Sequence, residues 1–341
     1  MTTLLEYIED DEDAIEIPAK RLRADLKLAA QSLTPKEARY FVDTYYQMQE
    51  NRKRAENQQR ALAVAEEPNL AVSFLKKEAE RLEGEVKYML GEFADSQPIG
   101  IWAQTITGSG RIISAGLVAH IDIGRAPTVG HIWSYAGLNP NQKWKGKKIV
   151  TQIVAEYLKG RKPTPDDLPV LVQLVEGIGL GTVQRLVSTN KEGKPRKLTA
   201  DSIISALSLR PWNASLKTLC WKIGESFVKV SNHPQDIYGH IYAERKAWEQ
   251  VQNEQGRYKD QADIGLERVG KSTEAYGYYK KGLLPPGQIY SRAKRYAVKL
   301  FLAHYHHVAY ELHYGKQPPN PYVIDHMNHN DIISPPNWPM A

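Results

Sequence analysis

Apolar residues recur at helical spacing in two long stretches near the beginning of the chain. We expect one helix over residues 34–65 and a second over residues 70–93, because residues 66–69 (Glu-Glu-Pro-Asn) interrupt the pattern. Thr34 and Glu37 are spaced to form a capping box at the start of the first helix. The apolar stripes are Ala38, Phe41, Val42, Tyr45 and Met48 in the first helix and Phe74, Leu75, Leu82, Val86, Met89 and Leu90 in the second. The two helices predict a helical hairpin, which we expect to form a homo-oligomer or to act as a spacer arm.

The remainder of the chain also favours helices, but they are shorter and more often interrupted. Residues 95–252 are divided into short helical pieces by Pro and Gly, and residues 253–288 are polar, with little periodicity. A strong helical stripe returns over residues 289–313. The tail from residue 315 to 341 holds six of the 20 prolines, so we expect it to be largely extended.

Charge is distributed unevenly along the chain. The first 16 residues carry seven acids and no Lys or Arg, so the other 325 residues have a net charge of +13 against +6 for the whole chain. A basic body of this kind favours a polyanionic partner, because each phosphate that it neutralises releases condensed counterions.

Other features of the composition exclude several classes of protein. The single cysteine, Cys220, excludes an internal disulfide and a zinc site built on several cysteines. The acidic start lacks the pattern of a signal peptide, and no apolar run approaches the ~20 residues that span a bilayer. We therefore expect a cytoplasmic, nucleoid-associated protein without a membrane partner.

The sharpest local motif is Gly177-Ile178-Gly179, which lies between an apolar helix end and an amphipathic helix. This pattern is typical of a helix-hairpin-helix motif, in which the glycines allow a tight turn and the second helix directs its N-terminal amides at a phosphate. Thr182, Gln184 and Arg185 follow at positions that could add side-chain contacts. Two alternatives are an ordinary helix C-cap and a dinucleotide-binding turn, although no β-rich run precedes the motif.

A second copy of the motif lies upstream at Gly108-Ser109-Gly110, followed by Arg111 and an apolar helix. Ser109 replaces the usual hydrophobic residue, so this copy matches the motif less closely. We expect Gly108, Gly110 and Arg111 to contact phosphates together with Gly177 and Gly179. Backbone contacts of this kind carry no sequence information and predict affinity without much specificity.

A basic patch with one aromatic residue follows the first motif. It consists of Lys143, Trp144, Lys145, Lys147 and Lys148. Such a patch is typical of nucleic-acid binding, with the tryptophan as a platform on which a base can stack. The alternative is a solvated loop.

Three segments in a fixed order resemble a known family. Thr105-Ile106-Thr107-Gly108-Ser109-Gly110 is followed by Ala119-His120-Ile121-Asp122-Ile123-Gly124-Arg125 and then by Tyr135-Ala136-Gly137-Leu138-Asn139-Pro140. Together they resemble the C-terminal helix-hairpin-helix domain of the RNA-bridged insertion-sequence transposases, which also carry a RuvC-like domain and a nucleophilic serine. The resemblance covers residues 95–150 and 208–248, with the Gly177 motif in an insertion between them. It implies a DNA partner and, because the family works with a guide RNA, RNA as a second candidate.

Two departures from the family pattern bear on catalysis. The helical hairpin precedes the first motif where the family has its RuvC-like domain, and we expect no room for that domain. The nucleophilic serine of the family follows the Ala-Gly-Leu-x-Pro segment, but residues 139–148 contain no serine, and Ser134 lies before the segment. Strand transfer of the family's type is therefore not expected, and a partner nuclease or recombinase could supply chemistry.

Two groups of C-terminal residues offer alternatives. Asp325, His326 and Asn328 resemble the opening of an HNH nuclease, but the helix that should follow with a metal ligand is missing. His304 and His307 share one helix face and could either bind a metal or pack in an aromatic interface.

These observations predict a mainly α fold with a long helical hairpin, a helix-hairpin-helix core and a C-terminal helix with an extended tail. The expected segments are an acidic, flexible head (1–33), the hairpin arm (34–94), the core (95–252), a loop or insertion (253–288) and the last helix with its tail (289–341). The expected function is non-catalytic binding of duplex or branched DNA in a mobile element or phage, without cofactor or metal. A metal-dependent nuclease and an assembly protein built on a repurposed transposase-like domain remain alternatives.

Overall fold

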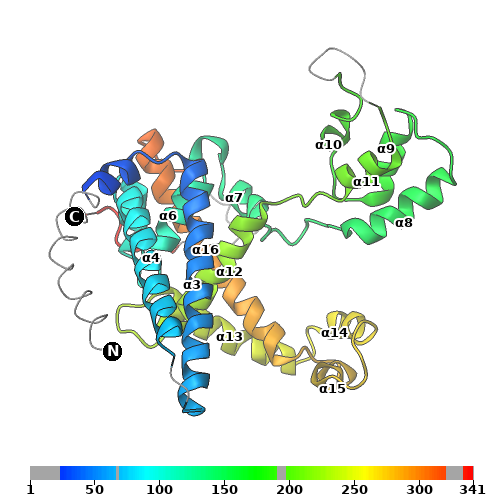
Figure 1. Cartoon of the computed structure of the whole chain (residues 1–341). Coiled ribbons are helices and arrows are strands. Elements are labelled where there is room, and N and C mark those ends of the chain that lie inside the picture. The colour runs from blue at the N-terminus through cyan, green and yellow to red at the C-terminus, as the bar shows by residue number, and fades with distance from the viewer. Residues whose placement is uncertain (1–23, 67–68, 190–196, 320–332, 341) are drawn as a thin grey trace. The chain divides into compact units, whose positions relative to one another are not determined.

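The structure is a computed structural model, and it describes residues 24–66, 69–189, 197–319 and 333–340. Within these ranges all regular elements are helices, which confirms the expected mainly α fold (Figure 1). The chain divides into two compact units, a first unit of residues 1–128 with 221–341 and a second unit of residues 129–220. The predicted core of residues 95–252 therefore has parts in both units.

The first unit contains the helices that precede residue 128 and those that follow residue 221. They are α3 (Pro35–Val64), α4 (Leu70–Asp95), α5 (Pro98–Gln104), α6 (Arg111–His120), η1 (Ile123–Arg125), most of α12 (Ala214–Val230), α13 (Tyr238–Glu254), α14 (Lys259–Leu266), α15 (Glu274–Lys280) and α16 (Pro286–Tyr314). The second unit contains α7 (Val129–Tyr135), α8 (Gly146–Leu158), α9 (Asp167–Val175), α10 (Leu180–Gln184), α11 (Ala200–Leu207) and the beginning of α12.

The predicted helical hairpin is formed by α3 and α4, which lie side by side (Figure 1). At the start of α3, the backbone N–H of Thr34 donates to the Glu37 carboxylate (2.8 Å) and the Glu37 N–H donates to the Thr34 hydroxyl (3.3 Å). This is the expected capping box, which satisfies amides that the first helical turn leaves unpaired. Asn69 caps α4 in a similar way by accepting from the N–H of Ala71 (2.9 Å).

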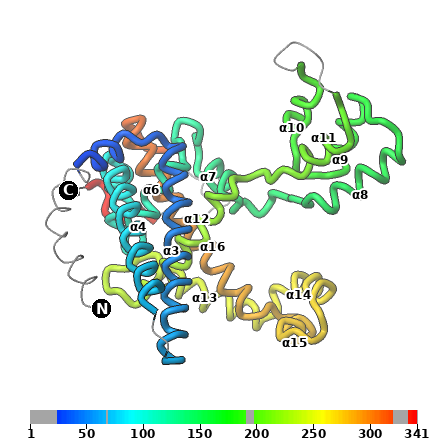
Figure 2. Tube along the Cα trace, in the orientation of Figure 1, coloured from blue at the N-terminus to red at the C-terminus, as the bar shows by residue number. Residues whose placement is uncertain are grey.

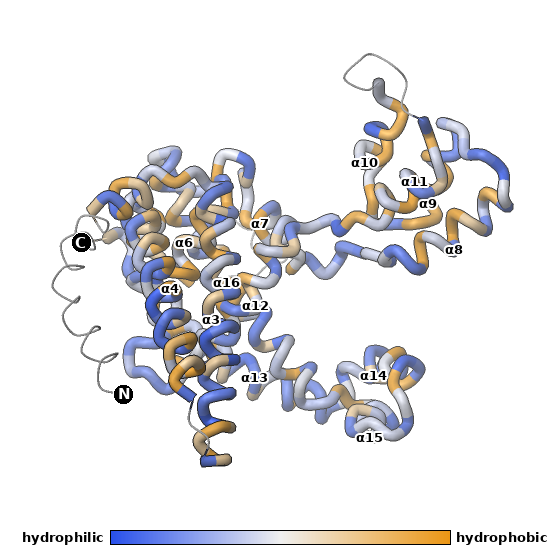
Figure 3. Tube along the Cα trace, viewed as in Figure 1, coloured by the Kyte–Doolittle hydropathy of each residue, from blue (hydrophilic) through white to orange (hydrophobic). Residues whose placement is uncertain are grey.

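The hairpin is anchored by its packing against α6. Its buried core consists of Ala38, Val42 and Tyr45 from α3, Val86, Leu90, Phe93 and Ala94 from α4, and Ile112, Ala115 and Ala119 from α6. Small side chains on three helices allow their axes to approach closely. The other end of the hairpin lacks such a partner among the described residues, since Val64 and Leu70 are 87% and 88% exposed, and Figure 3 shows hydrophobic residues at that end.

The long helix α16 forms the centre of the first unit. Phe301 contacts Trp102 of α5, Phe227 of α12 and Tyr238 of α13, with ring centroids 5.1–6.2 Å apart. Aromatic side chains bury a large area each, so this cluster joins helices from distant parts of the sequence. The helix predicted over residues 289–313 is confirmed, and it begins three residues earlier, at Pro286.

Residues 253–288, expected to be a loop or an insertion, contain α14 and α15 (Figure 2). The expectation of a loop was wrong, because the small core of this region uses tyrosines where a sequence pattern looks for aliphatic residues. This core consists of Tyr258, Ala262, Tyr279, Leu284 and Ile289. The buried carboxylate of Glu249 attaches the region to the unit by accepting from the Tyr258 hydroxyl (2.5 Å) and from Arg292 (2.7 Å).

The second unit has a core of its own. It is formed by Val150, Val154 and Leu158 from α8, Leu168, Leu171, Val172 and Val175 from α9, Val183 from α10, and Ile203, Ile204, Ala206 and Leu207 from α11. Asp167, at the start of α9, accepts from both terminal nitrogens of Arg161 (2.5 and 2.7 Å) and from the Thr164 N–H (2.7 Å). The Arg161 guanidinium holds the pKa of this carboxyl well below its usual range, so the α8–α9 connection is fixed by a charged clamp.

The two ends of the chain are only partly described. Residues 24–31 are helical, which corrects the expectation of a flexible head for that part of residues 1–33. The described tail residues, 316–319 and 333–340, contain no helix, and residues 336–337 form a turn. Among the described residues, none of the helices is both long enough and apolar enough to cross a bilayer.

Candidate nucleic-acid interface

The first Gly-x-Gly motif connects α5 to α6 in the first unit. Gly108 has φ +90°, and a Cβ there would lie 3.0 Å from side-chain atoms of both Phe227 and Val230. The position therefore requires glycine for its backbone conformation and for its packing against α12. The Ser226 hydroxyl donates to the Gly108 carbonyl (2.7 Å), which further ties the turn to that helix.

Ser109 occupies the place that a hydrophobic residue takes in the usual motif. It is only 1% exposed, and its hydroxyl lies 3.4 Å from that of Ser114, which also donates to the Ser109 carbonyl (3.3 Å). A buried hydroxyl is tolerated when it has such partners. The substitution that weakened the sequence match is therefore compensated within α6.

The second motif connects α9 to α10 in the second unit and has the same local geometry. Gly177 has φ +79°, and a Cβ there would lie 2.6 Å from the Lys143 carbonyl oxygen. Ile178, between the two glycines, packs against the core of the second unit. In both motifs the second glycine (Gly110 or Gly179) is an extended N-cap, and a Cβ added there would meet no other atom of the described residues within 4 Å.

The helices that follow the two motifs differ in length. α6 has 10 residues, whereas α10 has 5 and ends before Arg185. Gln184 and Arg185 are exposed, and Thr182 is half-buried. The helix dipole and the unpaired amides of a first turn act most strongly in a helix of several turns, so α6 offers the better anion-binding terminus.

The basic patch after the first motif lies against the second motif. Lys143 forms an ion pair with Glu176 (3.0 Å), and the Lys145 ammonium donates to the Leu174 carbonyl (2.9 Å). Trp144 donates its indole N–H to the Ser208 carbonyl (2.9 Å), and the Arg210 guanidinium lies 5.0 Å from its ring centroid. Trp144 is thus held in place by its neighbours, while Lys147 and Lys148 are exposed at the start of α8.

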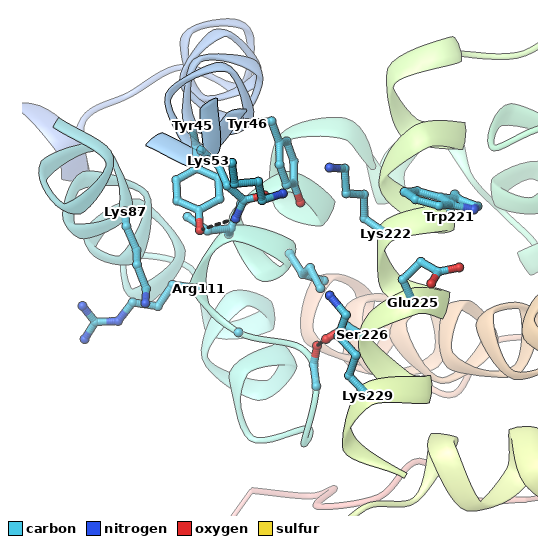
Figure 4. Close-up of a pocket in the computed structure, with 15 residues that line it drawn as sticks. Tyr45, Tyr46, Lys53, Lys87, Arg111, Trp221, Lys222, Glu225, Ser226 and Lys229 are labelled. Atoms are coloured by element: carbon cyan, nitrogen blue, oxygen red, sulfur yellow. Dashed lines mark hydrogen bonds between the residues drawn. The ribbon is translucent and has the colours of Figure 1, made fainter. Parts of the chain in front are cut away.

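A concave pocket of about 400 Å³ lies in the first unit beside the N-terminus of α6 (Figure 4). We call it the basic pocket, because five cationic side chains from four helices line it: Lys53 from α3, Lys87 from α4, Arg111 from α6, and Lys222 and Lys229 from α12. The other lining residues are Tyr45, Tyr46, Gln49, Gly108, Gly110, Ile112, Ile113, Trp221, Glu225 and Ser226.

Little negative charge opposes these cations. Within the part of the chain that the structure describes, Lys87, Arg111, Lys222 and Lys229 have no carboxylate within 4.0 Å. Lys53 pairs with Glu50 (3.1 Å), and the carboxylate of Glu225, which lines the pocket, pairs with Lys294. Burial, and then the positive charge of Lys53, lowers the pKa of Lys222. Among the described residues, four of the five cations of the basic pocket therefore have no direct carboxylate partner.

Two details of packing position the cations. A Cβ at Gly91 of α4 would lie 2.6 Å from Cδ of Arg111, so the missing side chain leaves room for the arginine to lie along that helix. The Lys222 ammonium lies 4.0 Å from the centroid of the Tyr46 ring, a cation–π contact. Figure 4 shows Lys222 extending from α12 toward Tyr46 on α3.

Of the cations in the basic pocket, only Arg111 was predicted from the sequence as a contact residue. The others come from separate helices, so no local run of basic residues marks them. The one available signal is the spacing of Lys222 and Lys229, which lie seven residues apart and therefore share a face of α12.

The alternative catalytic residues receive no support from the described part of the chain. Asp325, His326 and Asn328 lie outside it. His304 Nε2 donates to the Ile333 carbonyl (2.9 Å), and its Nδ1 lies 2.6 Å from the Tyr238 hydroxyl, while His307 pairs with Glu311 (3.0 Å). Among the described residues no group of three or more His, Cys, Asp or Glu side chains is arranged to hold a metal ion.

Comparison with known proteins gives one match. No curated protein and no solved structure matches the chain. The model of the family described as Transposase IS116/IS110/IS902 family matches residues 102–157, a segment that runs from α5 through the first Gly-x-Gly motif to α8. Over these residues the chain is similar to transposases of that family, which supports a transposase-like relationship.

Proposed function

We propose that this protein binds DNA through the phosphate backbone, with the basic pocket and the adjoining Gly-x-Gly turn as the principal contact. The observation that carries the proposal is the convergence of five cations from four helices on the N-terminus of α6, four of them without a carboxylate partner in the described structure. Similarity to a transposase family over residues 102–157 makes DNA the best-supported polyanion.

The electrostatics of the basic pocket favour a phosphate. Like charges that share a pocket repel one another, and a bound anion removes this repulsion while it releases counterions from the DNA. Arg111 can bind a phosphate through two nitrogens, whereas the lysines act as point charges. The backbone N–H groups in the first turn of α6 are also available as donors to a phosphate, because the N-cap residue, Gly110, has no side chain that could accept from them.

The motif of the second unit offers a second contact in this proposal. Gly177, Gly179, Thr182, Gln184 and Arg185 would act together with Lys147 and Lys148. We thus propose that both turns are helix-hairpin-helix motifs, although the short α10 makes the second a weaker anion site than the first. The DNA-binding role is proposed to be non-catalytic, with RNA, a recombinase or a nuclease as further partners.

The experiment is a salt series of DNA-binding affinities measured by fluorescence anisotropy. Lys87→Gln and Lys229→Gln should each weaken binding and reduce the slope of log K against log salt by about 1, because one phosphate contact is lost. Lys271→Gln serves as the control, because this exposed lysine lies outside the basic pocket.

Two outcomes would contradict the proposal. Wild-type binding that does not depend on salt would exclude a phosphate-backbone contact. Equal effects of the three substitutions would show that general charge, and not the basic pocket, attracts the DNA.

A further inference from the structure

We propose that the basic pocket accepts an unpaired nucleotide, so that the protein prefers single-stranded or branched DNA to a continuous duplex. This inference rests on the proposed binding of phosphate and specifies the form of DNA that the same site takes. It follows from the shape of the pocket and from the tryptophan at its edge.

The shape of the pocket matches a nucleotide better than it matches a duplex. A volume of about 400 Å³ lies within the range of sites that enclose a small ligand. Its cations come from α3, α4, α6 and α12, so they surround a hollow and do not follow a line. Duplex phosphates are spread over a convex surface, with one charge per ~1.7 Å of axis, and could reach only the rim of such a hollow. A flexible single strand can insert one phosphate together with its sugar.

Trp221 supplies a surface for the base. It lines the pocket from α12 and is 59% exposed, which is a large exposure for an apolar ring of this size. The Lys222 ammonium lies 6.0 Å from the centroid of the Trp221 ring. Because phosphate and base are linked through one sugar, a phosphate held at Lys222 would have its own base within reach of that ring.

Stacking on Trp221 requires an unpaired base. In a duplex the faces of the bases are covered by their neighbours, whereas a single strand can turn a base out and stack it on an aromatic side chain. Trp248, elsewhere in the first unit, differs from Trp221 because the Arg245 guanidinium already covers its ring at 4.0 Å. This difference makes Trp248 a suitable control: it is also exposed, at 40%, and lies outside the pocket.

The test compares three DNA molecules of equal length at fixed salt: a single strand, its duplex, and a single strand with abasic sites that retains every phosphate. They are titrated with the full-length wild type and with Trp221→Leu, Trp221→Phe and Trp248→Leu. Leucine keeps apolar volume but lacks a π face, and phenylalanine restores one. Thermal unfolding of each variant checks that the fold is retained.

We expect tighter binding of the intact single strand than of the duplex. Trp221→Leu should weaken single-strand binding about fivefold or more while changing duplex binding less than twofold, and Trp221→Phe should recover most of the loss. The abasic strand should bind wild type and Trp221→Leu equally, because it has no base that could stack on the Trp221 ring. Trp248→Leu should behave as wild type.

The possible failures are distinguishable. Equal affinity for single strand and duplex, or an equal loss for both in Trp221→Leu, would overturn the unpaired-nucleotide site and leave phosphate binding intact. A lack of salt-dependent binding to all three DNA molecules would overturn the proposed function as well.

Discussion

Two of the three histidines that are buried among the described residues, His120 and His304, have lowered pKa values. His304 is 3% exposed between Tyr238 and Ile333, and His120 is 7% exposed, with no hydrogen-bond partner for Nδ1 in the described structure. Burial lowers the pKa of each to about 4, with further contributions from His307 at His304 and from Arg39 at His120. Since histidine in an unfolded chain titrates near pH ~6.5, the unfolded state binds protons between these values that the folded state does not.

The protein should therefore lose stability as the pH falls from 6.5 toward 4, while the contribution of these rings is constant above pH 7. At pH 5 the loss from His304 alone should be about 2 kcal/mol relative to pH 7.5, given its lowered pKa. Urea unfolding of wild type and His304→Gln at both pH values measures it. The variant should be less stable at pH 7.5, but its stability should change less between the two. An unchanged pH dependence would mean that His304 titrates normally in the folded protein.

Single residues also mark the limit of what the sequence could predict about the site. The first glycine of each turn, Gly108 or Gly177, was identifiable because few other residues tolerate its positive φ. Ser109 weakened the first match because it replaces the usual hydrophobic residue, and its partner Ser114, five residues further along, belongs to no recognised pattern. The lysines of the basic pocket could not be predicted, because their proximity results from the packing of separate helices.

At the scale of elements, predictions succeeded where the cause of a helix is local. The capping box at Thr34, the break after α3 and the apolar stripe of α16 are short-range signals, and the structure has each of these helices within a few residues of its expected range. α14 and α15 were missed because a polar, tyrosine-rich sequence becomes a core only when it packs beside α13 and α16.

The turn between α5 and α6 should depend on its first glycine and not on its second. Gly108→Ala should lower the free energy of unfolding by about 1–3 kcal/mol, because φ is +90° and the new Cβ would crowd Phe227 and Val230. Gly110→Ala is the matched control: its φ is −76°, and there is open space around the added methyl group. Chemical denaturation compares the two. Similar losses of stability would show that the turn does not have the described geometry.

At the scale of the whole molecule, each unit has its own buried core, yet part of the first unit's hairpin is not covered by other described residues. The apolar stripe predicted on α4 is buried at Val86 and Leu90, whereas Phe74 and Leu75 are 62% and 60% exposed. Exposed apolar residues that cluster on one surface are typical of a protein interface. The homo-oligomer predicted through the hairpin would account for the exposed half of the stripe.

If a second copy of the chain covers this surface, charge placed on it should separate the copies. Phe74→Glu and Leu75→Glu each remove apolar burial worth about 1.5–3 kcal/mol, so the dissociation constant of the oligomer should rise about tenfold or more. Tyr40→Glu is the control, because Tyr40 is 68% exposed on α3 outside the stripe. Sedimentation equilibrium should show an oligomer for wild type and Tyr40→Glu and a shift toward monomer for the other two variants. A monomeric wild type, or an oligomer that tolerates both α4 substitutions, would exclude the hairpin as the interface, and the exposed stripe would then have to contact a different protein.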